Sequence, residues 1–393
     1  MKSILSKVFI FNFLLLLGCN QPEKPINVFT LKGKISGQDT GKIILGIRTD
    51  SVIIYDTALI SNGEFVFKGK IDEPYGVELN AGNDSNRVSF FIDPADMQIL
   101  LIKDSFSQYK LLGSKTNDES NEIDSLCYGN SQIMQSLREA YFNNSELLNN
   151  VQNENERKKL IAENDSLDLK ITEAREKEYG IWLYFIINHP KSHLSPLYLN
   201  MLRQREFISL DSTKSLFSNL DNSVKITLFG RQLSNDIKIQ ENTQIGASAP
   251  DFKAIDINNQ QITLSQFKGE KVILIELWAS WCGPCRSGFP FLRSLYNKFH
   301  SKGFDIIAIA NLDINQETWK SAIIQEKIED WHHVATIFRE DEPLNQDILK
   351  NYPLGPIPMS FLIDKSGKVV GSYVGHSENN ENELEDKLIE LLK

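Results

Sequence analysis

Two cysteines, Cys282 and Cys285, are separated by Gly-Pro and lie where an apolar run over residues 271–277 gives way to a helical pattern. A thiol at a helix N-terminus meets unpaired N–H groups and the positive end of the helix dipole, which stabilise its thiolate. Three positions bring the second sulfur within about one helical turn, so the two thiols can close a ring. An exposed Cys282 thiolate could therefore attack a disulfide, and Cys285 could resolve the mixed disulfide that forms.

The other readings of these residue types are weaker. A zinc site would need a second C-x-x-C or a suitably spaced His pair, and the sequence has neither. His189 and His193 are four apart, but Pro190 breaks the helix that would place both on one face. His332 and His333 are adjacent and would point opposite ways on a strand. We therefore predict no metal, and a merely structural disulfide stays as the alternative to a redox-active one.

The residues that surround the cysteine pair have the pattern of an α/β domain over residues 243–393. The run at 271–277 is almost continuously apolar, as in a central buried strand. The other expected elements are a helix from the cysteines through Phe299, a strand over 304–310, a helix over 316–327, strands over 358–363 and 368–374, and a helix over 381–392.

Residues 246–393 resemble the thioredoxin fold, and specifically the TlpA/ResA-like thiol–disulfide oxidoreductases. The resemblance rests on four stretches: W-A-S-W-C-G-P-C-R over 278–286, Pro290, Gly246-x-x-x-Pro250-x-Phe252, and Ile357-Pro358-x-x-Phe361-Leu362-Ile363-Asp364. It implies a central mixed sheet and an exchange of thiols with disulfides in protein substrates. No cofactor is implied.

The resemblance also assigns roles to individual residues. Cys282 is the attacking thiol and Cys285 the resolving one, and together they form the redox-active disulfide. Pro358 matches a cis-proline that lets the backbone of Ile357 hydrogen-bond to a substrate chain. Pro290 matches a kink in the active-site helix. The expected substrate contacts are Trp281, Gly283, Pro284, Ile357 and Pro358.

The sequence departs from the family pattern in three places. Many relatives carry an acid three residues after the second cysteine, where this chain has Gly288, which would leave the acid position empty. Glu276, six residues before Cys282, stands where thioredoxins have a buried Asp. We infer that Glu276 is the acid–base group for Cys285, since desolvation favours its neutral form; the alternative is a local hydrogen-bonding role. Pro356 replaces a glycine usual in relatives and stiffens the substrate rim.

The Gly-Pro dipeptide between the cysteines resembles that of the reducing thioredoxins, whose potential is about −270 mV. We therefore predict a reductase, with a disulfide oxidant or isomerase of the same fold as the alternative. A peroxidase is disfavoured because Ala279, three residues before Cys282, replaces the Thr or Ser that activates a peroxidatic thiol. A non-catalytic surface-binding lipoprotein is a further alternative, against which the intact cysteine pair argues.

Residues 1–18 predict a lipoprotein signal peptide, with basic Lys2 and Lys7 before an apolar run that is too short to span a bilayer. The run ends in Leu-Leu-Gly-Cys, which resembles a bacterial lipobox and implies lipid attachment to Cys19. Residues 19–27 would form a tether. The alternative is an ordinary signal peptide with an incidental cysteine.

This reading places the protein in the cell envelope, lipid-anchored and facing the periplasm or the cell exterior. Disulfides can persist outside the cytoplasm. The expected partners are protein disulfide substrates and a membrane-embedded electron donor.

Residues 28–115 predict a small antiparallel β domain of unknown role, from alternating apolar residues broken by turn residues. It looks like a domain often placed upstream of TlpA-like domains. The expected strands are 28–35, 42–47, 51–60, 64–70, 88–92 and 98–102.

Residues 116–242 predict a helical segment, because apolar residues recur there at three and four positions. Its second long helix should end near His189, before Pro190, and Ser192 could cap a shorter helix from Ser195. Cys127 lies among the apolar positions, and we interpret it as a buried, inert thiol rather than a redox partner.

Composition agrees with this multidomain reading. The chain has 393 residues and a net charge of 42 − 52 = −10, which argues against a nucleic-acid partner, because phosphate binding needs a clustered excess of Lys and Arg. Past the N-terminus no stretch of 18 or more apolar residues occurs, as a spanning helix would need. Four cysteines are too few for a disulfide-framework domain.

Overall fold

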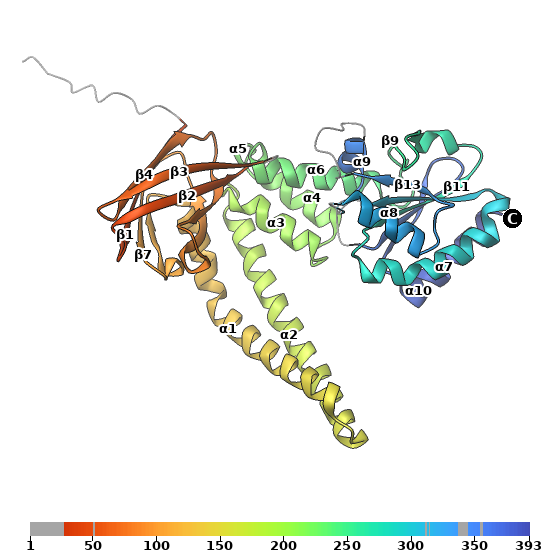
Figure 1. The fold of residues 1–393 in the computed structure, drawn as a ribbon, viewed down its shortest axis with the longest axis horizontal. Helices are drawn as coiled ribbons and strands as arrows, with labels where there is room; N and C mark the ends of the chain where they lie inside the picture. Colours follow the sequence, from red (N-terminus) through yellow and green to blue (C-terminus); the bar gives the residue numbers. More distant parts are fainter. Residues whose placement is uncertain (1–26, 50–51, 311–312, 314, 337–344, 354–356) are drawn as a thin grey trace, which may run out of the picture. The chain divides into compact units, whose positions relative to one another are not determined.

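The computed structural model describes residues 27–49, 52–310, 313, 315–336, 345–353 and 357–393. The chain divides into two compact units, residues 1–118 and 119–393. The second unit holds both the helical segment and the α/β domain, in that order (Figure 1). The sequence of architectures is the predicted one: a β domain, a helical segment and then an α/β domain with a mixed sheet.

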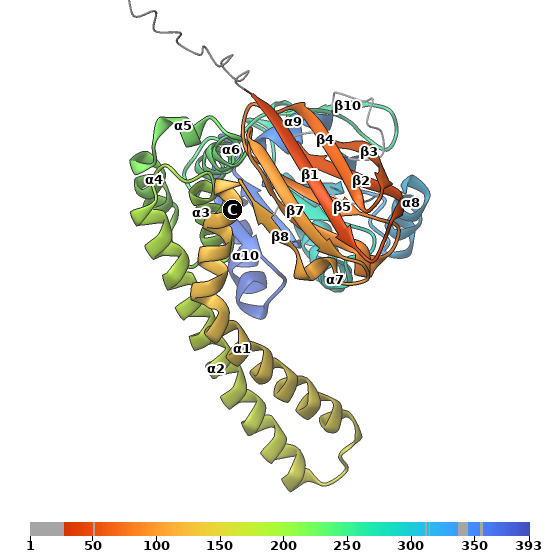
Figure 2. The ribbon, with the colours of Figure 1, turned by 90° about the vertical axis from the view of Figure 1, so that its left-hand side faces the viewer.

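The first unit contains an eight-stranded sheet, whose strands lie side by side in Figure 2. Its spatial order is β6-β5-β2-β3-β4-β1-β7-β8. The strands span β1 Val28–Ser36, β2 Thr40–Arg48, β3 Ile53–Ser61, β4 Glu64–Lys70, β5 Tyr75–Asn80, β6 Arg87–Ile92, β7 Asp96–Ile102 and β8 Lys110–Leu112. Alternate residues of β1, β4 and β7 are buried, which gives the sheet one apolar face.

The expectation of a purely antiparallel domain is wrong at one pair of strands. β1 and β7 run parallel, with Thr30 opposite Asp96 at the start of the ladder. The chain passes through five other strands before β7 returns beside β1 in the same direction. Asn62 and Gly63, which lie in the turn between β3 and β4, both have positive φ, which Asn and Gly tolerate best.

Two long helices open the helical segment: α1, Lys115–Asn150, and α2, Glu154–Asn188. They lie side by side in both views (Figures 1 and 2), joined by the hydrogen bond from Asn130 to the carbonyl of Ala174. The second ends at Asn188, as predicted from Pro190. The next helix begins one residue earlier than predicted. Its N-cap residue is His193 rather than Ser192, and Ser192 Oγ accepts the N–H of Leu194 at 3.1 Å. The remaining helices are α3 Leu194–Gln204, α4 Leu210–Asn219, α5 Asn222–Lys225 and α6 Leu228–Asn242.

The C-terminal domain is built on a five-stranded mixed sheet of order β13-β12-β11-β14-β15. Its strands are β11 Val272–Trp278, β12 Phe304–Ala310, β13 His332–Ala335, β14 Met359–Ile363 and β15 Val369–Val374. The first three run parallel, and β14 and β15 are antiparallel to their neighbours. The helices are α7 Gly283–Phe299, α8 Gln316–Gln325, α9 Gln346–Asn351 and α10 Glu378–Leu391, and β9 Lys253–Ile255 pairs with β10 Gln261–Thr263.

Strand β11 separates two apolar cores. Leu274 and Trp278 pack with residues of α7, including Cys285. Ile273, Ile275 and Leu277 instead belong to the core on the other face. Because side chains alternate along a strand, Glu276 points to the same face as Leu274 and Trp278. The single acid of this strand therefore lies on the side of the sheet that α7 covers.

Candidate active site

Cys282 and Cys285 form a disulfide at the N-terminus of α7. Cys282 is the N-cap residue, and its Sγ accepts the backbone N–H of Cys285 at 3.2 Å. The expectation of an exposed Cys282 is wrong for this oxidised state, in which its side chain is 4% exposed. Its sulfur is bonded to that of Cys285, which is fully buried against the core beneath the helix.

The residues beside the disulfide are exposed. Trp281 is 63% exposed, and Gly283 and Pro284 are exposed in the first turn of α7. Proline suits this turn because its missing N–H would have no partner within the helix. Ser287 donates a hydrogen bond to the Pro284 carbonyl at 2.8 Å. Pro290 lies inside the helix.

The Ile357–Pro358 peptide bond is cis, as the family resemblance implies. Pro358 is buried, and its carbonyl accepts the N–H of Gly375 at 2.9 Å. Pro356, whose effect on the substrate rim was predicted from the sequence, lies outside the described residues.

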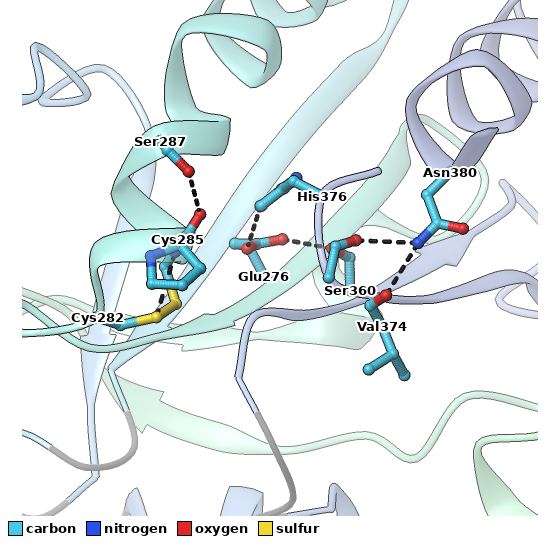
Figure 3. A network of polar contacts seen from close by, with 10 residues as sticks. Glu276, Cys282, Cys285, Ser287, Ser360, Val374, His376 and Asn380 are labelled. Atoms are coloured by element: carbon cyan, nitrogen blue, oxygen red, sulfur yellow. Dashed lines mark hydrogen bonds and ion pairs between the residues drawn. A yellow bond between two sulfur atoms is a disulfide. The ribbon is translucent and has the colours of Figure 1, made fainter. Parts of the chain in front are cut away.

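Glu276 is completely buried, with its carboxylate held between two side chains (Figure 3). Ser360, its register partner on β14, donates its hydroxyl to Oε2 at 2.5 Å. Nε2 of His376 lies 3.4 Å from Oε1. The carboxylate thus has a hydrogen-bond donor on one side and an imidazole on the other.

Sequence reasoning missed His376, which lies just after β15 and is only 10% exposed. Asn380 of α10 fixes this segment by donating to the carbonyls of Val374 and Gly375, at 2.9 and 3.0 Å. No local motif marks this histidine, because it meets Glu276 from a position a hundred residues away in sequence.

The position expected to be left empty by Gly288 is occupied by the His376 ring. A Cβ built on Gly288 would lie 2.2–2.5 Å from three ring atoms. Gly288 follows Cys285 by three residues, and residues so spaced are neighbours on one helix face. The imidazole therefore packs on α7 one turn beyond the second cysteine.

The charge on His376 follows from its surroundings. Burial lowers the pKa of His376, but the hydrogen-bonding and charge of Glu276, together with the charge of Glu381, outweigh burial and raise that pKa above its ordinary value. The protonated imidazole is therefore favoured beside the carboxylate.

A second buried acid fixes the turn before Cys282, and like His376 it was not predicted from the sequence. Asp313 accepts the backbone N–H of Ser280 at 2.9 Å and also the Ser280 hydroxyl. The N–H of Cys282 in turn donates to the Ala279 carbonyl at 3.0 Å. These bonds hold the backbone that presents the first cysteine to the helix terminus.

The remaining sequence candidates lie elsewhere in the second unit. Cys127 is a free, buried thiol of α1, as predicted, and burial together with the charge of Glu178 raises its pKa.

His189 stacks on Phe185 at the end of α2. His332 contacts Asp305, whereas His333 contacts the Ile328 carbonyl, so the two rings do not share a site. Among the described residues, no group of three or more His, Cys, Asp or Glu could hold a metal ion.

Comparison with known proteins matches two parts of the chain. The Redoxin family model covers residues 244–388, and the Domain of unknown function (DUF4369) model covers residues 29–120. The thiol-disulfide oxidoreductase ResA of Bacillus thuringiensis is 36% identical over 149 residues, which are 38% of this chain and 79% of the relative. ResA of Bacillus subtilis is 31% identical over 140 residues, which are 35% of this chain and 70% of the relative.

Among solved structures, the thioredoxin domain of a Bacteroides vulgatus thiol-disulfide oxidoreductase is 31% identical. The match covers 37% of this chain and 98% of that one, with a TM-score of 0.32.

A cysteine pair at the start of a helix, packed on a mixed sheet and followed by a cis-proline, defines a thioredoxin-like oxidoreductase. Within this class, the sequence identity to the ResA relatives and the share of their length that is matched identify the family. The chain belongs to the ResA-like thiol–disulfide oxidoreductases.

Proposed function

We propose that this protein is a lipid-anchored, extracytoplasmic reductase of protein disulfides. The observation that carries the proposal is the disulfide at the N-terminus of α7, with a buried carboxylate on the same side of the sheet. The Gly-Pro dipeptide between the cysteines favours reduction over oxidation or isomerisation.

The reaction begins with the reduced pair. The Cys282 thiolate, stabilised by the helix terminus, attacks one sulfur of a substrate disulfide. That disulfide breaks, one substrate thiolate leaves, and a mixed disulfide joins Cys282 to the other substrate sulfur. Deprotonated Cys285 then attacks Cys282 Sγ, and the second substrate thiolate leaves with the electron pair. The substrate has gained two electrons, and the Cys282–Cys285 disulfide has formed.

We assign to Glu276 the role of accepting the proton of the Cys285 thiol. Cys285 is fully buried, so its thiol has poor access to water as a base. Glu276 lies on the same face of the sheet, and a positioned carboxylate can accept the proton during attack.

The substrate chain would bind beside the exposed residues around the disulfide. Trp281, Gly283 and Pro284 present an aromatic ring and a helix terminus to solvent. Ile357 and Pro358 complete the site by family resemblance, through backbone hydrogen bonds to the substrate.

The location of the protein rests on the N-terminal sequence. The signal peptide, Cys19 and the tether through residue 26 lie outside the described residues. No helix in the described part of the chain has the length and apolarity to cross a bilayer. We assign membrane attachment to acyl chains on Cys19, and the reducing electrons to a membrane-embedded donor.

An insulin-reduction assay with dithiothreitol as electron source tests the proposal. The native chain should catalyse reduction, Cys282→Ser should abolish it, and Cys285→Ser should accumulate a mixed disulfide with the substrate. A Cys282→Ser variant as active as the native protein would refute the proposed function.

A further inference from the structure

Glu276 and His376 form a buried pair in which each side chain is the other's oppositely charged neighbour. Glu276 Oε1 and His376 Nε2 lie 3.4 Å apart, and neither atom has a hydrogen bond of normal geometry within the described residues. Ser360 holds only the other carboxylate oxygen, Oε2. A buried carboxylate needs a compensating charge, and the protonated imidazole supplies one.

The His376 ring of this pair packs on the face of α7 that carries Cys285. The His376 ring fills the space of the missing side chain at Gly288, one turn beyond Cys285. Any side chain at position 288 would overlap the ring. The glycine and the histidine are therefore complementary parts of one arrangement.

Other charged groups around the imidazole favour its protonated form. Glu276 faces it from β11 and Glu381 acts on it from α10, while α7 presents the uncharged Gly288 and the disulfide of Cys285. The His376 side chain is 10% exposed, whereas its Nε2, which faces Glu276, is buried.

We propose that His376 is a positioning residue that keeps Glu276 ionised for the resolving step and then returns the proton to solvent. This inference rests on the proposed dithiol function. The S–H bond of Cys285 breaks and its proton passes to Glu276. The Cys285 thiolate attacks Cys282 Sγ, and the substrate thiolate leaves. His376 then releases its own proton to water and takes up the proton held by Glu276, so Glu276 is ionised again and the pair carries the same net charge before and after the step.

The test uses stopped-flow mixing of the reduced full chain with 5,5′-dithiobis(2-nitrobenzoate). Attack by Cys282 releases the first coloured thiolate, and resolution by Cys285 releases the second, so the two steps are read separately. Rates are measured across the range in which histidine titrates, roughly pH 5 to 8.

His376→Gln should leave the first phase unchanged. Without the imidazolium the buried carboxylate loses its compensating charge, so the second phase should slow by about 10- to 100-fold near pH 6, within the effect of a positioned acid–base group. The loss should shrink as the pH rises through the raised pKa of His376, because the native imidazole then loses its charge as well. Gly288→Ala should reproduce this behaviour by displacing the ring without removing it.

His332→Gln is the matched control, since His332 forms the same kind of pair with buried Asp305, also at 3.4 Å, near the start of β12. It should match the native protein in both phases.

A second phase with the native pH profile in His376→Gln would overturn the inference, as would a slowing that is equal at every pH. If that variant does not fold, Gly288→Ala decides by the same criteria, and if neither folds the ring is structural and the inference fails. Loss of both phases in the native protein would instead refute the proposed function.

Discussion

The two cysteines have unequal surroundings. Cys282 caps α7, and its sulfur accepts a backbone N–H, so its thiolate is stabilised without a nearby base. Cys285 lies in the core and has no comparable terminus to stabilise its charge. The attacking step therefore depends on the helix, whereas the resolving step depends on a proton acceptor.

Glu276→Gln tests this difference, because it keeps size and hydrogen-bonding capacity while removing the titrating group. Resolution of the mixed disulfide should slow by roughly 10²–10⁴-fold, and attack by Cys282 should change far less. The fold should stay intact, because a neutral amide is less costly to bury than a carboxylate. Separate stopped-flow rates for the two steps give the answer, and an unchanged resolving rate would assign the proton to solvent.

Cys127 provides a contrasting thiol within the same chain. Its burial and the raised pKa of its thiol both suppress the reactive thiolate. Cys127→Ser should therefore keep native reductase activity in the insulin assay. Loss of activity in a folded variant, or a mixed disulfide trapped on Cys127, would show that this thiol takes part in turnover.

The sequence predicted the cysteine pair and the buried acid, because each lies within one short segment of recognisable pattern. It did not predict His376, which reaches Gly288 across the fold and belongs to no motif. Asp313 was missed for the same reason: its partner Ser280 lies on a different segment. Contacts between distant segments depend on packing that spacing alone does not encode.

At the scale of elements, an ion network joins the N-terminal ends of three parallel strands. Asp305 of β12 contacts Lys271, just before β11, at 2.6 Å and His332 of β13 at 3.4 Å. Burial alone would raise the pKa of Asp305, but hydrogen bonds from His332 and Lys271 outweigh it and hold that pKa below its ordinary value.

This network should make the free energy of unfolding fall at acidic pH. Because the pKa of Asp305 is lower in the folded chain, its contribution is present above the unfolded value, near 3.9, and is lost as the pH falls through the folded value. Asp305→Asn should lower the free energy of unfolding at pH 7 by about 1.5–3 kcal/mol. Urea unfolding at pH 7 and at lower pH measures the effect, and an equal difference at both would contradict the assignment.

Elements with strong periodicity or clear boundary residues were predicted within a few positions. The end of α2 before Pro190 and the strand β12 are examples. Strands β5 and β8 were missed because β5 mixes polar and apolar residues without a clear period and β8 has three residues. The parallel β1–β7 pair was missed because strand order is set by the whole sheet rather than by either strand.

At the scale of the whole molecule, membrane attachment is the main prediction. Cys19→Ser removes the atom that would carry the lipid, and each buried CH₂ contributes about 0.8 kcal/mol to anchoring. The full-length chain made in a bacterium should then move from the membrane fraction to the soluble fraction. Cys127→Ser, the matched cysteine control, should stay with the membrane. A Cys19→Ser protein that also stays there would contradict lipid anchoring.

The most direct test of the proposed reductase is the midpoint potential of the Cys282–Cys285 couple. Equilibration of the full chain with dithiothreitol buffers, followed by alkylation of free thiols, gives the fraction reduced at each potential. A background with both Cys127→Ser and Cys19→Ser confines the signal to the active-site pair. A reductase should have a potential near that of reducing thioredoxins, about −270 mV. A potential near that of strong oxidants, about −120 mV, would contradict the proposed reductase.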